Sequence, residues 1–118
     1  MIAEGEHQLQ DFKTRIDDSR KIARTLVAFA NADGGRLLIG VKDNGTVSGV
    51  RVDEELHMVE AASELYCQPA VEFQSQVWKA DIRSVLEVVV EPSRQRPHRC
   101  EDEEGKWHAY LRLEDENI

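Results

Sequence analysis

The stretch AFANADGGRLLIGVKDNGTVSGV, residues 28–50, holds five of the seven glycines in this chain of 118 residues. Glycine-rich loops that bind nucleotides precede a helix, because the backbone N–H groups and the positive end of the helix dipole must face the phosphates. Gly34 and Gly35 instead follow a helical pattern and precede a β-rich run, and no GxxxxGK(S/T) motif occurs in the chain. We therefore expect the two glycines to end a helix and reverse the chain. An ATP-binding domain is the least favoured function.

The segment before these glycines predicts an amphipathic helix. Asp17 or Asp18 can cap its start, and its apolar residues recur at intervals of three and four. Asn31 falls at its end, where we expect the amide to cap backbone groups around the glycine turn; lining a binding site is the alternative. The predicted apolar stripe consists of Ile22, Leu26, Phe29 and Ala30.

An Asn44-Gly45 pair lies between two apolar runs, residues 36–42 and 46–52. Such a pair is the strongest short signal for a β-hairpin, because a type I′ turn needs a positive φ at both central positions. Residues 9–13 alternate between polar and apolar side chains, as in a strand. The first half of the chain therefore predicts the order strand, helix, strand, strand.

The second half of the chain predicts one more helix and three more strands. The elements are a helix at residues 53–67 with Leu56, Val59 or Met58, Ala62 and Leu65 facing inward, a hairpin of strands at residues 70–80 and 82–92 that turns at Ala80 and Asp81, and a strand at residues 107–113. The full order, βαββαβββ, predicts one α+β domain over residues 1–118, with an antiparallel or mixed sheet and two main helices on one face.

The net charge of −8 argues against a surface that is basic throughout. Basic residues nevertheless gather in two places where nucleic-acid phosphates could bind. The second of these clusters could instead lie in a solvated loop, with its positive charge neutralised by the acidic residues that follow it. The two clusters are Arg20, Lys21 and Arg24 on the first predicted helix, and Arg94, Arg96 and Arg99 in the segment SRQRPHR, residues 93–99.

No apolar run approaches the ~20 residues of a membrane span, and residues 1–10 lack the build of a signal peptide. We therefore expect a cytoplasmic protein without membrane contact. In that reducing compartment the two cysteines, Cys67 and Cys100, should be free. A zinc site built from these cysteines with His98 and His108 is disfavoured, because the paired CxxC spacing is missing.

Four stretches carry a resemblance to a known family: GEHQLQDFK at residues 5–13, the segment 22–50, PSRQRPHR at residues 92–99, and GKWHAYLRL at residues 105–113. The chain resembles the Schlafen AlbA-type domain family, also described as divergent AAA-like and RecG-related. The resemblance implies a nucleic-acid-binding domain, usually a DNA-binding module in transcription regulation. Domains of this type pair, so we expect a homo-oligomer, most simply a homodimer, with DNA or RNA as its partner.

The resemblance also implies an alternative function. Some members of the family cleave transfer and ribosomal RNA at three carboxylates with a divalent metal, and the matching positions here are Glu6, Asp11 and Asp43. Mg²⁺ or Mn²⁺ is the implied cofactor, and Lys13 could steady a transition-state oxyanion. Asp11 stands where the family has glutamate, so its carboxylate is one methylene shorter.

Ordinary structural roles are the competing interpretation of these carboxylates. Glu6 would then be solvated, Asp11 would pair with Lys13 or with an arginine of the helix, and Asp43 would support the turn. Glu6 precedes Asp11 by five residues, so the chain must bend for both carboxylates to share one face of a strand. We therefore expect three loosely grouped carboxylates, and a metal-dependent endoribonuclease ranks second to a non-catalytic nucleic-acid-binding module.

Overall fold

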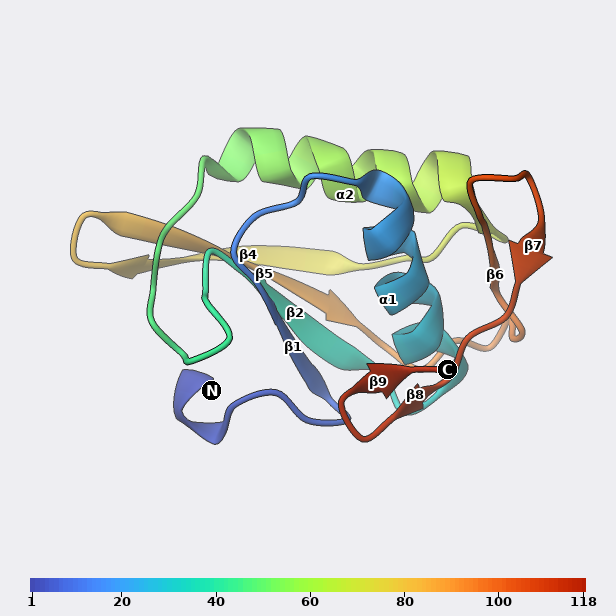
Figure 1. Cartoon of the computed structure of the whole chain (residues 1–118), viewed down its shortest axis with the longest axis horizontal. Helices are drawn as coiled ribbons and strands as arrows, with labels where there is room; N and C mark the ends of the chain where they lie inside the picture. The colour runs from blue at the N-terminus through green and yellow to red at the C-terminus, as the bar shows by residue number, and fades with distance from the viewer.

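A mixed four-stranded sheet forms the centre of the structure, a computed structural model that describes residues 1–118 (Figure 1). Its strands lie in the order β1-β2-β5-β4. β1 and β2 are parallel, which the helix between them allows, and the other neighbours are antiparallel. The α+β class and the mixed sheet predicted from the sequence are confirmed. The elements are β1 (Gln10–Lys13), α1 (Ser19–Asn31), β2 (Gly35–Ile39), α2 (Val52–Tyr66), β4 (Gln74–Ala80) and β5 (Arg83–Val90).

Both helices pack on the same face of this sheet and contact each other there (Figure 1). Asp18 is the cap of α1, because its carboxylate accepts the backbone N–H of Arg20 at 2.9 Å. In α2 the buried stripe runs through Val59, Ala62 and Ser63, whereas Leu65 falls beside it and is 63% exposed, so its predicted inward position is wrong. The main core joins Ile22, Leu26, Phe29 and Ala30 of α1 to Leu37, Ile39, Leu86 and Val88 of the sheet.

The opposite face of the sheet carries a smaller apolar cluster, with Phe12, Leu38, Val41 and Val85. The short 3-10 helix η1 (Ile2–Glu4) and the loop after β2 contribute the side chains that pack against it. Strand β4 forms one edge of the sheet, and the β4–β5 hairpin projects past the start of α2 in Figure 1.

Gly34 and Gly35 make the turn from α1 into β2, as predicted. Gly34 has a φ of +78°, and its N–H donates to the carbonyl of Phe29 at 2.9 Å, which closes the helix end. A Cβ on Gly34 would stand 2.6 Å from the carbonyl oxygen of Val90, and one on Gly35 would stand 2.5 Å from the Phe29 ring. Both positions therefore need glycine for the fold.

The strand predicted at residues 46–52 does not form. Only Gly45 of the Asn44-Gly45 pair has a positive φ, +88°, so the turn is not type I′. A single bridge follows the turn. The chain then crosses to β5, where the N–H of Val50 donates to the carbonyl of Ser84 at 3.0 Å. Residues 46–49 keep three backbone hydrogen bonds to Gly40 and Lys42, and from Val50 on a hydrogen bond to β5 takes the place of the expected ladder.

The predicted last strand, residues 107–113, is divided between two small sheets. Its start, β7, belongs to a three-stranded sheet in the order β3-β6-β7, and its end, β8, pairs with β9. The division occurs because Arg112 turns into the domain and is buried against β1. The observed order of elements therefore differs from the predicted one here and after β2. The short strands are β3 (Cys67–Gln68), β6 (Arg99–Glu101), β7 (Trp107–His108), β8 (Arg112–Leu113) and β9 (Glu116–Asn117).

Candidate nucleic-acid interface

Glu6 and Asp11 lie together at the start of β1. The backbone N–H of Phe12 donates to both carboxylates, at 3.0 Å to Asp11 Oδ1 and at 3.2 Å to Glu6 Oε2. The hydrogen bond between the two carboxyl groups, together with burial, raises the pKa of Glu6 to about 7. The bend that the five-residue spacing requires is therefore present, and the Glu6 carboxyl, while protonated, forms a hydrogen bond with Asp11.

Asp11 is neutralised by protein cations. It is 5% exposed, and its Oδ2 faces Arg112 Nη1 at 3.6 Å and Lys13 Nζ at 3.9 Å. The Arg112 guanidinium also donates to the backbone carbonyls of His7 and Gln10. Sequence reasoning missed Arg112, because no motif marks a single arginine near the end of an apolar strand. Lys13, for which the sequence left open a role at an oxyanion or a pairing with Asp11, faces Asp11.

Asp43 forms no hydrogen-bonded group with this pair. It is exposed in the turn after β2, and it lines a small hollow of about 260 Å³ with Gly5 and Phe12. No three His, Cys, Asp or Glu side chains in the structure are close enough to hold a metal ion. The arrangement of Glu6, Asp11 and Asp43 therefore does not fit a divalent cation, since the pKa of Glu6 is raised to about 7 and Asp11 already faces a guanidinium.

The basic residues of α1 are held at its surface by tyrosine rings. The guanidinium of Arg20 lies 4.5 Å from the centre of the Tyr66 ring, and that of Arg24 lies 5.6 Å from the centre of the Tyr110 ring. Such cation–π contacts position an arginine without neutralising its charge. Lys21 is exposed between them.

The second basic cluster lies in the arginine loop, residues 93–99. Asn31 holds this loop against the end of α1: its Oδ1 accepts the N–H of His98 at 2.7 Å, and its Nδ2 donates to the carbonyls of His98 and Tyr110 at 2.9 Å. The predicted contact of Asn31 with the glycine turn is therefore replaced by contacts with the loop and the C-terminal segment. Arg96 donates to the carbonyl of Ala32 at 3.5 Å.

The two clusters lie at the same end of the molecule. Helix α1 contacts β6, which begins at Arg99, and Asn31 at the end of α1 bonds to His98 of the loop. None of the six predicted phosphate-binding residues forms an ion pair in the structure. These six are Arg20, Lys21, Arg24, Arg94, Arg96 and Arg99.

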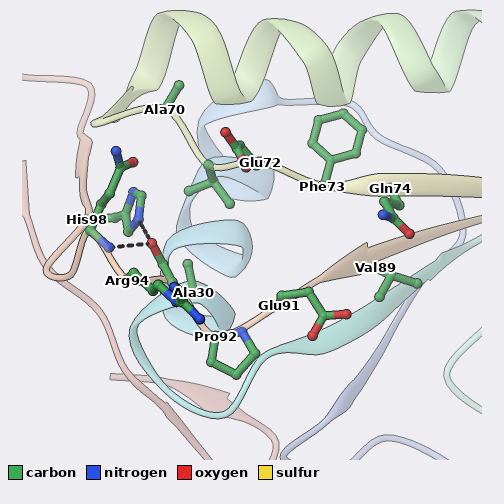
Figure 2. A pocket seen from close by; sticks show the side chains of 13 residues that line it. Ala30, Ala70, Glu72, Phe73, Gln74, Val89, Glu91, Pro92, Arg94 and His98 are labelled. Carbon is green, nitrogen blue, oxygen red and sulfur yellow. Dashed lines mark hydrogen bonds between the residues drawn. The ribbon is translucent and has the colours of Figure 1, made fainter.

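A cavity of about 710 Å³ opens beside the arginine loop (Figure 2). Phe73 lies on its α2 side, whereas Glu91 and Pro92 lie on the opposite side and Arg94 lies between them and His98. His98 is buried, with Nδ1 at 2.8 Å from the carbonyl of Pro69 and Nε2 at 2.6 Å from the hydroxyl of Ser93. The carbonyl can only accept, so Nδ1 carries a proton and His98 fixes the wall of the cavity.

Comparison with known proteins identifies a family. The family model described as Schlafen, AlbA_2 matches residues 6–118. The chain is similar in structure to the DIP2311 protein of Corynebacterium diphtheriae, with a TM-score of 0.62 and 19% identity over 94% of this chain and 22% of that one. It is also similar to the N-terminal domain of a RecG-related protein from Nitrosomonas europaea, with a TM-score of 0.62 and 23% identity over 87% of this chain and 76% of that one. No curated protein matches the chain.

The chain thus spans 22% of the length of the Corynebacterium protein. At these identities the two solved structures show a shared fold. The helices of the chain are too short or too polar to cross a membrane. Because the family model covers nearly all of its residues, the chain belongs to the Schlafen AlbA_2 family.

Proposed function

We propose that the domain binds nucleic acid through the six basic residues of α1 and the arginine loop. One observation carries the proposal: in a chain with a net charge of −8, these six side chains have no acidic partner. Unpaired arginines at a surface are available to bind phosphate oxygens in a bidentate manner.

The family and one structural neighbour support DNA as the proposed ligand. The family resemblance implies DNA-binding domains in regulators, and the Nitrosomonas europaea structure belongs to a protein named as related to the ATP-dependent DNA helicase RecG. The proposed role here is a DNA-binding module that reads the phosphate backbone and lacks its own ATP site, because Gly34 and Gly35 lie at the negative end of α1.

A charge-matched pair of variants tests the interface. Arg94→Ala with Arg96→Ala should weaken binding on every sequence and flatten the slope of log K against log salt by about one unit for each phosphate contact that is lost. The measurement is fluorescence anisotropy of labelled duplex DNA, single-stranded DNA and RNA, over about 50 to about 300 mM salt.

The control is Arg15→Ala with Lys42→Ala, which removes two exposed cations that form no ion pair, in the loops after β1 and β2. It lowers the net charge by the same amount, so its affinity should stay close to that of the wild type. Equal losses in the two double variants would show that binding depends on net charge alone, and unchanged binding in Arg94→Ala with Arg96→Ala would remove the loop from the interface.

The same experiment, repeated in the presence of Mn²⁺, tests the endoribonuclease alternative. Glu6 and Asp11 are close enough to share a proton, but Arg112 faces the Asp11 carboxylate. We therefore expect transfer RNA to remain intact, or nearly so, in the presence of Mn²⁺. Strong cleavage that Asp43→Asn abolishes, with the fold intact, would make the nuclease the better assignment.

We also infer that two copies of the domain associate along β4. All seven residues of this strand are exposed, and β5 is its only neighbour in the sheet. An exposed edge strand presents unpaired N–H and C=O groups to another strand. Two β4 strands related by a twofold axis would pair as antiparallel neighbours and join the two sheets.

A further inference from the structure

The two cysteines of the chain lie directly opposite each other in a small sheet. β3 and β6 are antiparallel, and their register places Cys67 across from Cys100. Residues that face each other in this way have Cα atoms about 4.5 to 5.5 Å apart and side chains on the same face. A disulfide spans Cα distances of about 4.4 to 6.8 Å. The backbone can therefore accept a disulfide between these cysteines without moving.

The structure holds both cysteines as thiols inside the main core. Cys67 Sγ lies 3.8 Å from the carbonyl oxygen of Ala23 and donates to it. Burial, with a smaller contribution from neighbouring Cys100, raises the pKa of the Cys67 thiol to about 12. A protonated, buried thiol reacts slowly, so the pair stays reduced unless the short strand β3 opens.

The position of the pair connects it to the cavity beside the arginine loop. Of the 13 residues that line this cavity, all except Ala30 lie between Cys67 and Cys100 in the chain. The arginine loop, residues 93–99, ends immediately before Cys100. A bond between the two sulfur atoms would close a covalent ring that contains the cavity wall and the loop.

We propose that Cys67 and Cys100 form a site of reversible oxidation, at which a low-molecular-weight disulfide converts the two thiols into an intramolecular disulfide. One cysteine thiolate displaces a thiol from the reagent and forms a mixed disulfide, and the second thiolate then displaces the other thiol. The protein loses two protons and two electrons, and the reagent disulfide is reduced to two thiols. The oxidised pair fixes the end of α2 to β6 and restricts the arginine loop.

The test is refolding of the full chain in glutathione redox buffers, because unfolding gives the reagent access to both thiols. We expect the oxidised protein to contain no intermolecular disulfide and to be about 2 Da lighter than the reduced protein. It should have no thiols that react with an alkylating reagent. Its Tm should exceed that of the reduced protein by on the order of 10 °C, because the closed loop restricts the unfolded chain. Reducing agent should reverse both changes.

Cys67→Ser and Cys100→Ser are the matched controls, since each should give only a mixed disulfide with glutathione and no rise in Tm. Glutathione adducts on both cysteines of the wild type, covalent dimers, or a pair that stays reduced in excess glutathione disulfide would overturn the proposal. An oxidised form that is less stable than the reduced form would overturn it as well. None of these outcomes depends on nucleic-acid binding.

Discussion

The carboxylate pair of Glu6 and Asp11 differs from a metal site because Arg112 lies beside it. Its side chain is 1% exposed and places a permanent positive charge beside Asp11. A divalent cation would have to displace that charge, and a buried arginine left without its carboxylate is costly. Gln10, whose carbonyl it also binds, lies 102 residues away in the chain. No local pattern could reveal such a partner, although the sequence did indicate that Asp11 pairs with a cation.

Glu6 gives a pH dependence that can be measured. Its hydrogen bond to Asp11 and its burial raise its pKa from 4.5 to about 7, so the folded protein holds this proton more tightly than the unfolded chain. The free energy of unfolding should therefore fall as the pH rises from about 4.5 to about 7, and the stabilisation is lost above that range. Glu6→Gln should remove this dependence and stabilise the domain above pH 7 by on the order of 1 kcal/mol, after discounting for solvent exposure.

Thermal unfolding of both proteins over a pH series measures this effect. Glu103→Gln, at an exposed residue without an ion pair, is the control and should follow the wild-type curve. A Glu6→Gln variant with the same pH slope as the wild type would show that the two carboxyl groups do not share a proton.

Among the elements, the sequence predicted those whose signals are local. Asp18 caps α1 and the glycine turn ends it, because both features depend on neighbouring residues. The hairpin at Asn44 is shorter than predicted, because from Val50 on the chain bonds to a strand that comes later. The burial of Leu65 was predicted from spacing alone. The way α2 packs against α1 and the sheet leaves this side chain exposed instead.

The contact between α1 and the arginine loop can be tested at Asn31. Asn31→Ala removes three hydrogen bonds to backbone groups of His98 and Tyr110. We expect the free energy of unfolding to fall by about 2–3 kcal/mol, because backbone groups that the amide satisfied lose their partners. Urea unfolding measures the loss, and amide hydrogen exchange should become faster in residues 93–99.

Asn44→Ala is the matched control for this change. Its amide accepts only the N–H of Thr46 within an exposed turn, so its removal should cost less than about 1 kcal/mol. If the two variants were equally stable and the loop amides exchanged as in the wild type, Asn31 would not hold the loop.

For the whole molecule, the exposed edge strand is the place where we propose that two copies meet. Val77 lies at the middle of β4 and is 46% exposed, and Ile82 at the tip of the hairpin is 89% exposed. In a twofold pairing of two β4 strands centred on Val77, a lysine at this position would face its own copy. The fold class and sheet were predictable from the sequence, but the identity of this edge depends on the strand order, which is a tertiary property.

We expect the wild type to be a dimer at tens of micromolar and Val77→Lys to be a monomer with the same fold. Light scattering gives the mass, and circular dichroism checks the fold. Thr46→Lys, at an exposed residue in the turn after β2, changes the charge equally and should leave the dimer intact. A wild-type monomer, or a Val77→Lys dimer, would exclude association through β4.

The burial of Arg112 has a consequence for synthesis on the ribosome. β1 leaves the exit tunnel well before residue 112, yet Asp11 gains its guanidinium partner only after residue 112 emerges. Thr25 of α1 likewise gains its hydrogen-bond partner Asn117 only 92 residues later. Because contacts this distant in the chain form late, α1 and β1 cannot complete these contacts until residues 112–117 have emerged. A downstream module fused to this domain would begin to appear just as the domain becomes able to fold, and the timing of translation at that junction would affect its yield.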